Sequence, residues 1–278
     1  LLRKIKQGSL ILPINILLLL NIFQLTATAQ TKLAGVTYRG GEQYGSIFNM
    51  VPGETDFSNQ RNFQGNGGFA AHDVKMVEVS NGRFFGMTKY GGQDSRGVLF
   101  EYNAATNTYI TRLSFTGSNG AEPGGGLFKA SNGKLYGMTE RGGATDQGII
   151  FEYDYNSNRF IKKIDMTTAN GSRPLGTFIQ ASNGNLLALT WGGGSGGTGA
   201  LIEYDYNSNV YTKKIDFVQA SGIRPSANLL LASNGKYYGL AAAGGTSFRG
   251  VLVEYDYAAN TYSKKIDFTQ ATGATPYG

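Results

Sequence analysis

The chain has no cysteine and a single histidine among its 278 residues. Without cysteine it can form no disulfide and offers no attachment site for a lipoprotein anchor. One imidazole excludes zinc sites built from several histidines and copper sites of the galactose-oxidase kind. The histidine, His72, precedes Asp73, which leaves a Ser-His-Asp set open against the simpler interpretation of a histidine in an irregular segment.

A strong excess of one charge is also missing, since 25 basic residues stand against 19 acidic ones, a net charge of +6. Three of the basic residues, Arg3, Lys4 and Lys6, lie in an amino-terminal leader, so its removal lowers the net charge to +3. Nucleic-acid binding requires a basic patch that replaces counterions along the phosphates, whereas the lysines here are spread along the chain. We therefore expect no nucleic-acid partner.

Long apolar runs are confined to the leader. Its basic start is followed by an apolar segment at residues 10–25 and by small residues at 27–29, the order of a cleavable secretory signal. A membrane anchor is the alternative, but Pro13 and Asn15 interrupt a run that falls short of the roughly 20 apolar residues a spanning helix needs. We predict a signal peptide at residues 1–29, a mature protein that is secreted or displayed on the cell surface, and no transmembrane segment after cleavage.

The main content of the chain is a repeat of 51 residues. An Asn-Gly pair and a Glu-Tyr pair each return four times at this interval: Asn81-Gly82, Asn132-Gly133, Asn183-Gly184, Asn234-Gly235, Glu101-Tyr102, Glu152-Tyr153, Glu203-Tyr204 and Glu254-Tyr255. Self-similarity at this period is typical of an array in which each unit buries its apolar face against its neighbours.

Each unit has the pattern of two hairpins. In one unit, apolar runs at 175–181 and 185–190 flank an Asn-Gly turn, and runs at 200–205 and 210–217 flank a polar turn. We expect each Asn-Gly pair to form a type I′ turn, in which both central residues take positive φ. Four short strands in about 50 residues match one propeller blade. The sequence thus predicts an all-β fold, a β-propeller built from 51-residue four-stranded antiparallel repeats.

A Gly-x-x-Pro link follows each regular unit and is expected to carry the chain into the next blade. We divide the chain into a signal peptide (1–29), a partial first blade (30–65), four blade repeats (66–121, 122–172, 173–223 and 224–275) and the start of a further truncated repeat (276–278). Because the first blade lacks a first strand and the chain begins without methionine, we expect an incomplete propeller, a fragment of a longer protein.

The most regular unit contains, in order, Ala130-Ser131-Asn132-Gly133-Lys134-Leu135-Tyr136-Gly137-Met138-Thr139, Gly142-Gly143 and Gly148-Ile149-Ile150-Phe151. This order resembles the GloVer tandem repeat of Gloeobacter and Verrucomicrobia, and the resemblance covers residues 33–278. It implies an exported, propeller-like bacterial protein, often with a separate C-terminal anchoring or sorting domain. The chain departs from the pattern at Ala241 and at Leu187-Ala188-Leu189. The glycine pair and the later Glu152-Tyr153-Asp154 are also similar to kelch repeats, which again implies a propeller.

Two motifs suggest ligand chemistry, and each has a simpler structural explanation. Glycines at 194–199 fit a dinucleotide-binding pattern, but the following residues predict a strand, so no helix N-terminus is available for a pyrophosphate. Asp154-x-Asn156-x-Asn158 has the spacing of calcium-loop ligands. Arg159 stands where such a loop needs its turn glycine, so an Asx-stabilised hairpin is favoured.

Glu152 and Asp154 are spaced like the paired carboxylates of glycosidases. The same pair recurs in the next two units, which favours a scaffold role in which the carboxylates pair with lysines. Lysine pairs such as Lys162-Lys163 on the fourth strand are interpreted as protection of a sheet edge, with a polyanion-binding strip as the alternative. We predict no catalytic residue, no metal site and no cofactor, and an enzyme is the less favoured class.

The loops after the second strand of each unit differ most between repeats, and variable loops on a fixed frame are typical of binding surfaces. They should gather on one face of the propeller, with ordinary sequence drift as the alternative. The candidate ligand-binding residues are Tyr38, Tyr90, Arg141, Trp191 and Phe248. Our hypothesis is an exported, non-catalytic scaffold that binds an extracellular glycan or protein through this loop face; a purely structural surface-layer role is compatible with the same sequence. The alternative is an accessory or, less favoured, catalytic module of an extracellular polysaccharide-active enzyme.

Overall fold

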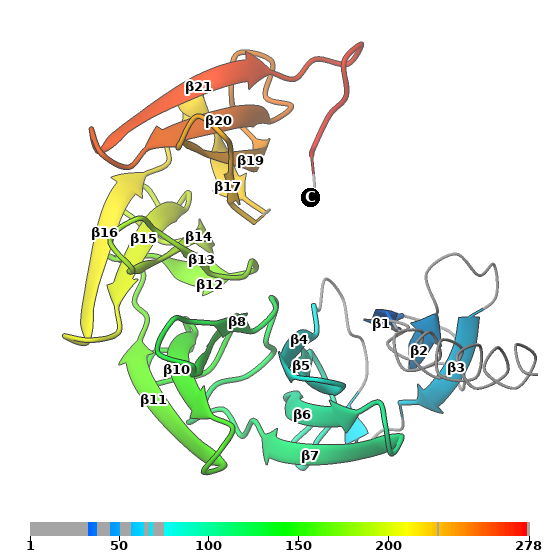
Figure 1. The fold of residues 1–278 in the computed structure, drawn as a ribbon. Helices are drawn as coiled ribbons and strands as arrows, with labels where there is room; N and C mark the ends of the chain where they lie inside the picture. The colour runs from blue at the N-terminus through cyan, green and yellow to red at the C-terminus, as the bar shows by residue number, and fades with distance from the viewer. Residues whose placement is uncertain are drawn as a thin grey trace, which may run out of the picture.

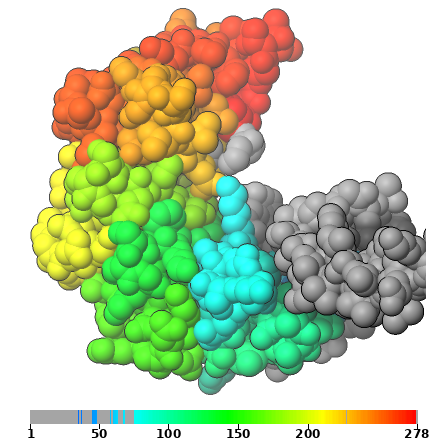
Figure 2. Space-filling model, in the orientation of Figure 1, coloured from blue at the N-terminus to red at the C-terminus, as the bar shows by residue number. Residues whose placement is uncertain are grey.

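The computed structural model describes residues 33–37, 45–50, 57–63, 67–68, 75–226 and 228–276. These residues form five antiparallel sheets, numbered here blades 1 to 5 in chain order. The blades follow one another along an open arc and pack side by side (Figures 1 and 2). The described part of the chain contains no α-helix, and none of its helical segments is long and apolar enough to cross a membrane. The prediction of an all-β propeller is confirmed.

The strands of the five blades are short. Blade 1 contains β1 (Leu33–Val36), β2 (Ser46–Met50) and β3 (Phe57–Asn62). Blade 2 contains β4 (Val77–Ser80), β5 (Arg83–Thr88), β6 (Val98–Asn103) and β7 (Thr108–Ser114), and blade 3 contains β8 (Phe128–Lys129), β9 (Leu135–Thr139), β10 (Ile149–Asp154) and β11 (Arg159–Asp165). Blade 4 contains β12 (Ser172–Pro174), β13 (Ile179–Gln180), β14 (Leu186–Gly192), β15 (Ala200–Asp205) and β16 (Val210–Asp216). Blade 5 contains β17 (Ile223–Pro225), β18 (Leu230–Leu231), β19 (Tyr237–Ala243), β20 (Val251–Asp256) and β21 (Thr261–Asp267), and the 3₁₀ turn η2 (Gln219–Ser221) precedes it.

Strand order within each blade follows the chain, as in β4-β5-β6-β7, and the last strand lies on the outside of the arc (Figure 1). The predicted first strand at 175–181 is wrong in extent. Two short pieces, β12 and β13, pair separately with β14. The break follows Arg173, whose φ is +52°, and Pro174, which has no N–H to continue the ladder.

The strands β10, β15 and their counterparts are buried on both faces. In β10, the five residues from Ile149 to Tyr153 are all buried. Ile150 packs into one apolar cluster, whereas Phe151 and Tyr153 pack into another. The period-two pattern therefore separates two cores, one on each side of the blade, which is the arrangement expected for an array.

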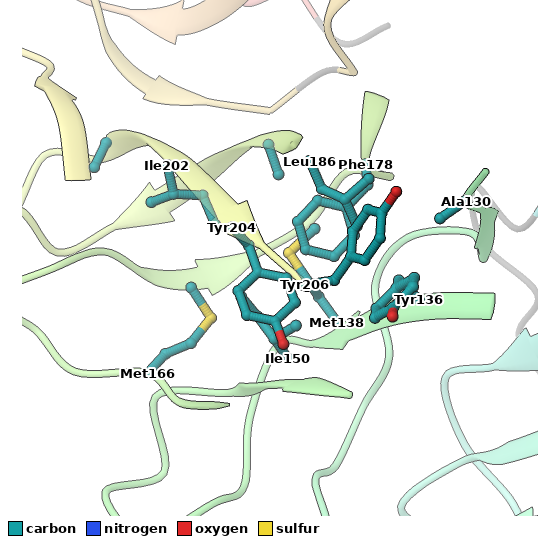
Figure 3. Packing of buried hydrophobic residues seen from close by; sticks show 12 residues of the cluster. Ala130, Tyr136, Met138, Ile150, Met166, Phe178, Leu186, Ile202, Tyr204 and Tyr206 are labelled. Carbon is teal, nitrogen blue, oxygen red and sulfur yellow. The ribbon is translucent and has the colours of Figure 1, made fainter. Parts of the chain in front are cut away.

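Each apolar core joins two consecutive blades. The core between blades 3 and 4 combines Met138 and Ile150 from one blade with Leu186 and Ile202 from the next (Figure 3). At its edge the Tyr136 and Tyr206 rings stack with centroids 5.2 Å apart. Stacked aromatic pairs contribute about 0.5–1.5 kcal/mol beyond the area they bury. The blades are thus held to their nearest neighbours and not to a single central core.

The Asn-Gly turns differ from the predicted type I′. At Asn132-Gly133 only the glycine has positive φ, +80°. The Gly133 N–H donates to the Ala130 carbonyl at 2.9 Å, and the Ala130 N–H donates to Lys134 at 2.9 Å. This is a type I turn followed by a bulged glycine, a three-residue hairpin loop. The prediction was wrong because it counted only two loop residues, and the preceding serine is a third.

The departure at Ala188 has a structural explanation. In blade 3, Gly137 lies opposite Phe151 across the strand pair, and the ring covers the glycine so closely that a Cβ there would clash with it. In blade 4, Ala188 lies opposite Ile202. The smaller aliphatic side chain leaves room for the alanine methyl group, so the two substitutions compensate each other.

Candidate functional site

The two ends of the strands form two different faces of the array. The hairpin turns between first and second strands, and between third and fourth strands, lie at one end of the strands; we call this the turn face. The loops between second and third strands and the Gly-x-x-Pro links lie at the opposite end; we call this the crossover face. It contains the loops that the sequence identified as variable.

On the crossover face, an aspartate at the end of the fourth strand holds the variable loop of its own blade. Asp165 accepts the Ala144 N–H at 2.8 Å, and Asp216 accepts the Ser195 N–H at 2.9 Å. The same aspartate pairs with the first lysine of the lysine pair, as Lys213 does with Asp216 at 2.8 Å. Hydrogen bonds from the loop and the lysine outweigh the effect of burial, so the pKa of Asp216 is lowered. The loops are therefore anchored while their exposed side chains vary.

The links that cross between blades share a second anchor. In the residue before each link proline φ is positive: +52° at Glu122, +52° at Arg173, +55° at Arg224 and +50° at Thr275. Its N–H donates to the loop of the preceding blade, as Arg224 does to the Thr198 carbonyl at 2.8 Å. The proline then packs on a glycine of that blade, where a Cβ on Gly199 would lie 2.6 Å from Pro225 Cδ. The link backbone is the same in all four places, while the residue before the proline changes in charge.

Between blades 2 and 3 the crossover face is closed by ion pairs. Lys89 Nζ lies 2.6 Å from Glu140 and 3.8 Å from Glu122. Arg141 lies 3.9 Å from Glu122 and 3.3 Å from Asp146. Burial alone would lower the pKa of Lys89, but the hydrogen bond and charge of Glu140 outweigh it, and the pKa is raised. The charged groups here are satisfied by one another.

In blade 4 the crossover face has an open hollow of about 730 Å³. Trp191 and Arg173 line it, together with Gln147 and Thr168 from the blade 3 side and Lys213. The Arg173 guanidinium carbon lies 5.9 Å from the centre of the Trp191 ring. Arg224 of blade 5 approaches the same ring to 4.9 Å. The hollow thus combines an aromatic surface, cations and small polar groups. Its volume lies within the usual range of ligand pockets, about 300–1,000 Å³.

The structure places the candidate residues at separate points of the crossover face. Tyr90 and Arg141 belong to the ion-pair cluster, since the Lys89 ammonium lies 5.8 Å from the Tyr90 ring centre and Arg141 lies beside Glu122. Trp191 belongs to the hollow. Phe248 projects from a loop of blade 5 and is 70% exposed. Tyr38 lies outside the described residues, as do His72 and the leader at 1–29.

Sequence reasoning missed Arg173 and Arg224. They occupy the position before the link proline, and the corresponding residues in the neighbouring repeats are Glu122 and Thr275. This position varies in charge at the same 51-residue interval as the loops. Alignment of the link residues, and not only of the loops, would have revealed the signal.

On the turn face, the repeated glutamates are buried and paired. Glu152 accepts from Lys134 Nζ and from the Tyr136 hydroxyl, both at 2.9 Å, and Lys163 lies 3.6 Å away. Burial alone would raise the pKa of Glu152, but these hydrogen bonds and charges outweigh it and the pKa is lowered. The second lysine of the pair therefore neutralises a buried carboxylate. The expected pairing of the repeated acids with lysines is confirmed.

The Asp-x-Asn-x-Asn segments form the Asx-stabilised hairpins that were favoured over calcium loops. Asp154 Oδ1 accepts the N–H groups of Asn156 at 3.0 Å and Ser157 at 3.3 Å. Asn158 Oδ1 accepts the Tyr153 hydroxyl. Within the described ranges, no group of three or more His, Cys, Asp or Glu side chains could hold a metal ion. The glycines at 194–199 are followed by β15, a strand, as predicted.

Repeated antiparallel sheets of three to five strands along an arc, with variable loops on one face, define the protein as a β-propeller. A model of the Gloeobacter/Verrucomicrobia repeat matches residues 21–213, and the chain belongs to this family. This confirms the resemblance to the GloVer repeat, while the likeness to kelch repeats stays a prediction. No curated protein matches the chain.

Among solved structures, the chain is similar to the crystal structure of TolB from Acinetobacter baumannii, with a TM-score of 0.52 and 13% identity. The match covers 84% of this chain and 52% of the TolB chain, so this chain spans about half the length of that structure. TolB is a β-propeller protein. At this level of identity the likeness shows the fold alone.

Proposed function

We propose that this protein is an exported, non-catalytic repeat scaffold that binds an extracellular glycan through its crossover face. The observation that carries the proposal is the hollow around Trp191. The β-sheet framework beneath it repeats from blade to blade, whereas a tryptophan ring with two arginines beside it occurs only there among the described residues. A feature that breaks the repeat on an otherwise uniform frame is where selection for a ligand is expected.

The shape of the hollow favours a glycan over a protein partner. A volume of about 730 Å³ suits one or a few sugar rings, and the half-exposed Trp191 ring offers a flat apolar surface. Thr168 and Gln147 lie beside it and have groups that hydrogen-bond hydroxyls. A protein interface of standard size would need roughly 800 Å² per partner, with several aromatic anchors close together.

The position of the carboxylates supports a non-catalytic role. The repeated Glu152 and Asp154 lie toward the turn face, and Lys134 approaches both, at 2.9 and 3.9 Å. The described residues that line the hollow include neither a carboxylate nor a histidine. Acid–base hydrolysis of a glycosidic bond would require two carboxyl groups about 5–10 Å apart at the ligand.

Export rests on the leader pattern at residues 1–29 and is tested by the mature terminus. We expect the extracellular or surface fraction of expressing bacteria to contain a chain that begins at Gln30, identified by mass spectrometry of the amino-terminal peptide. Retention of the full chain inside the cell would contradict export.

Binding is tested on a panel of immobilised neutral and acidic polysaccharides and on extracellular protein extracts. We expect retention on at least one polysaccharide, and Trp191→Ala should weaken it about tenfold or more, as loss of a central aromatic anchor does. Val210→Ala, which truncates an exposed apolar side chain on the turn face between β15 and β16, is the control and should leave this binding unchanged. Retention on protein only, or no retention at all, would overturn the proposal.

A further inference from the structure

The hollow in blade 4 has an excess of positive charge. Lys213 is neutralised by Asp216 at 2.8 Å. Neither the Arg173 nor the Arg224 guanidinium has a carboxylate within 4 Å among the residues that the structure describes. Both instead lie over the Trp191 ring. Two guanidiniums without an acidic partner therefore remain beside one aromatic ring.

The corresponding place in blade 3 has the opposite charge. Glu122, at the position of Arg173, lies within 4 Å of Lys89 and Arg141. The link backbone does not require arginine, since its positive φ and its N–H bond to the preceding blade are the same for Glu122 and Arg173. The reversal of charge is thus a property of the side chains alone.

The two arginines differ in their relation to the hollow. Arg173 lines it, together with Trp191 and Ser172. Arg224 comes from the next blade, lies 4.9 Å from the ring centre and is not part of the lining. Both arginines make cation–π contacts with the ring, but of the two only Arg173 belongs to the lining of the hollow.

We propose that the hollow binds an acidic sugar, the uronic acid residue of a polyuronate, with Arg173 pairing with its carboxylate; this inference rests on the proposed function. The planar guanidinium matches a carboxylate with two parallel hydrogen bonds. Trp191 packs on the apolar face of the sugar ring, and Thr168 and Gln147 bind its hydroxyls.

The experiment uses the full chain and two polymers that differ only in charge. Polygalacturonate and its methyl ester have the same sugar, and the ester lacks the carboxylate. Because Trp191 is the single tryptophan of the chain, its fluorescence reports directly on the hollow during titration. We expect polygalacturonate to change the emission and to bind at least about tenfold more tightly than the ester, with affinity falling as salt rises.

Variants separate a specific pair from general attraction. Arg173→Gln should weaken polygalacturonate binding about tenfold and reduce its advantage over the ester. Arg159→Gln removes the same charge from an exposed position at the turn between β10 and β11 and should change neither. Melting curves establish that both variants are folded.

The outcomes distinguish this inference from the proposed function. Equal binding of acid and ester, or equal loss in the two variants, would overturn the acidic-sugar assignment and leave glycan binding intact. A third outcome is that neither polymer binds but a neutral polysaccharide does, and that Trp191→Ala abolishes this binding. This outcome would also overturn the acidic-sugar assignment and leave glycan binding intact. Absence of binding to every polysaccharide would overturn both.

Discussion

The sequences of blades 3 and 4 align at an interval of 51 residues, but two side chains on their crossover faces differ in charge or type. Where blade 3 has Glu122 and Glu140, blade 4 has Arg173 and Trp191. The first pair is closed by Lys89 in an ion cluster, and the second borders an open hollow. Substitution at two positions thus accompanies the change from an ion-paired surface to an open hollow, while the aspartate and proline anchors are kept in both blades.

The frame itself also differs between these blades, but in a compensated way. Gly137 with Phe151 in blade 3 corresponds to Ala188 with Ile202 in blade 4. Glu152 is held by two lysines and a tyrosine, whereas Glu203 is held by one lysine, a tyrosine and the amides of Asn183 and Asn185. In these two blades the changes in the β-sheet framework are therefore compensated by their neighbours.

The largest expected effect comes from breaking one matched pair. Gly137→Ala places a methyl group against the Phe151 ring and should lower the free energy of unfolding by about 2 kcal/mol, as overpacking of a core does. Urea denaturation measures the change. The second substitution, Phe151→Ile, copies blade 4 and should cost less in the Gly137→Ala background than alone, with a coupling of about 1 kcal/mol or more. Additive costs would show that the pair does not compensate.

The next effect concerns the buried glutamates. Glu152→Gln removes a carboxylate that accepts from Lys134 and Tyr136 and should cost about 1–2 kcal/mol at neutral pH. Glu203→Gln should cost less, since Asn183 and Asn185 can still donate to a carboxamide oxygen. Equal costs would contradict the difference between the two blades.

The pH dependence of these variants follows from the lowered pKa of both glutamates. A folded-state pKa below the unfolded value of about 4.3 means that the stabilisation is complete above about pH 5 and is lost as the pH falls through the folded-state pKa. The stability difference between the wild-type protein and Glu152→Gln should therefore disappear in acid. A difference that persists well below the folded-state pKa of Glu152 would point to packing rather than charge.

A smaller effect separates the two loop anchors. Asp216→Ala releases the Ser195 N–H and the loop that lines the hollow, and polygalacturonate binding should weaken about fivefold, or ~1 kcal/mol. Asp165→Ala removes the same anchor from blade 3 and serves as the control, with unchanged binding. Tighter binding by Asp216→Ala would mean that Asp216 competes with the ligand for Lys213.

The smallest effect is expected at the ion cluster. Lys89 and Glu140 are 2.6 Å apart, with side chains 24% and 15% exposed, so a double-mutant cycle to alanine should give a coupling below about 1 kcal/mol that shrinks with salt. Since the pKa of Lys89 is raised, this coupling should persist at neutral pH and vanish only above the unfolded value of about 10.4. A coupling insensitive to salt and alkali would contradict an ionic origin.

Much of the β-sheet framework could be predicted from the sequence because the same strand and turn pattern occurs in every repeat. Alternation at 200–205 and the Asn-Gly pairs identified strands and hairpins, and repetition removed the ambiguity of any single segment. The broken first strand could not be predicted, since it depends on a positive φ at Arg173 before a proline, a conformation that local preference disfavours. Contacts with the preceding blade impose it.

The site was predicted only in part. Trp191 stood out because it replaces a charged residue at its repeat position. The contact between Trp191 and Arg224 joins two blades, so it could not be predicted from the pattern within one repeat. Tyr90 and Arg141 were grouped with Trp191 by their loop position, but their neighbours are the charged groups of another blade pair.

The proline links described above also bear on how such arrays change in length. Each unit carries a glycine that receives the proline of its successor, and the link that follows it supplies that proline, as Gly199 and Pro225 do. A gene duplication or deletion of one whole unit would leave every remaining joint with a matching half. A duplication that is not a whole number of units would disturb this match. Growth by whole units therefore keeps all joints between blades intact. A newly copied blade could then diverge on its crossover face.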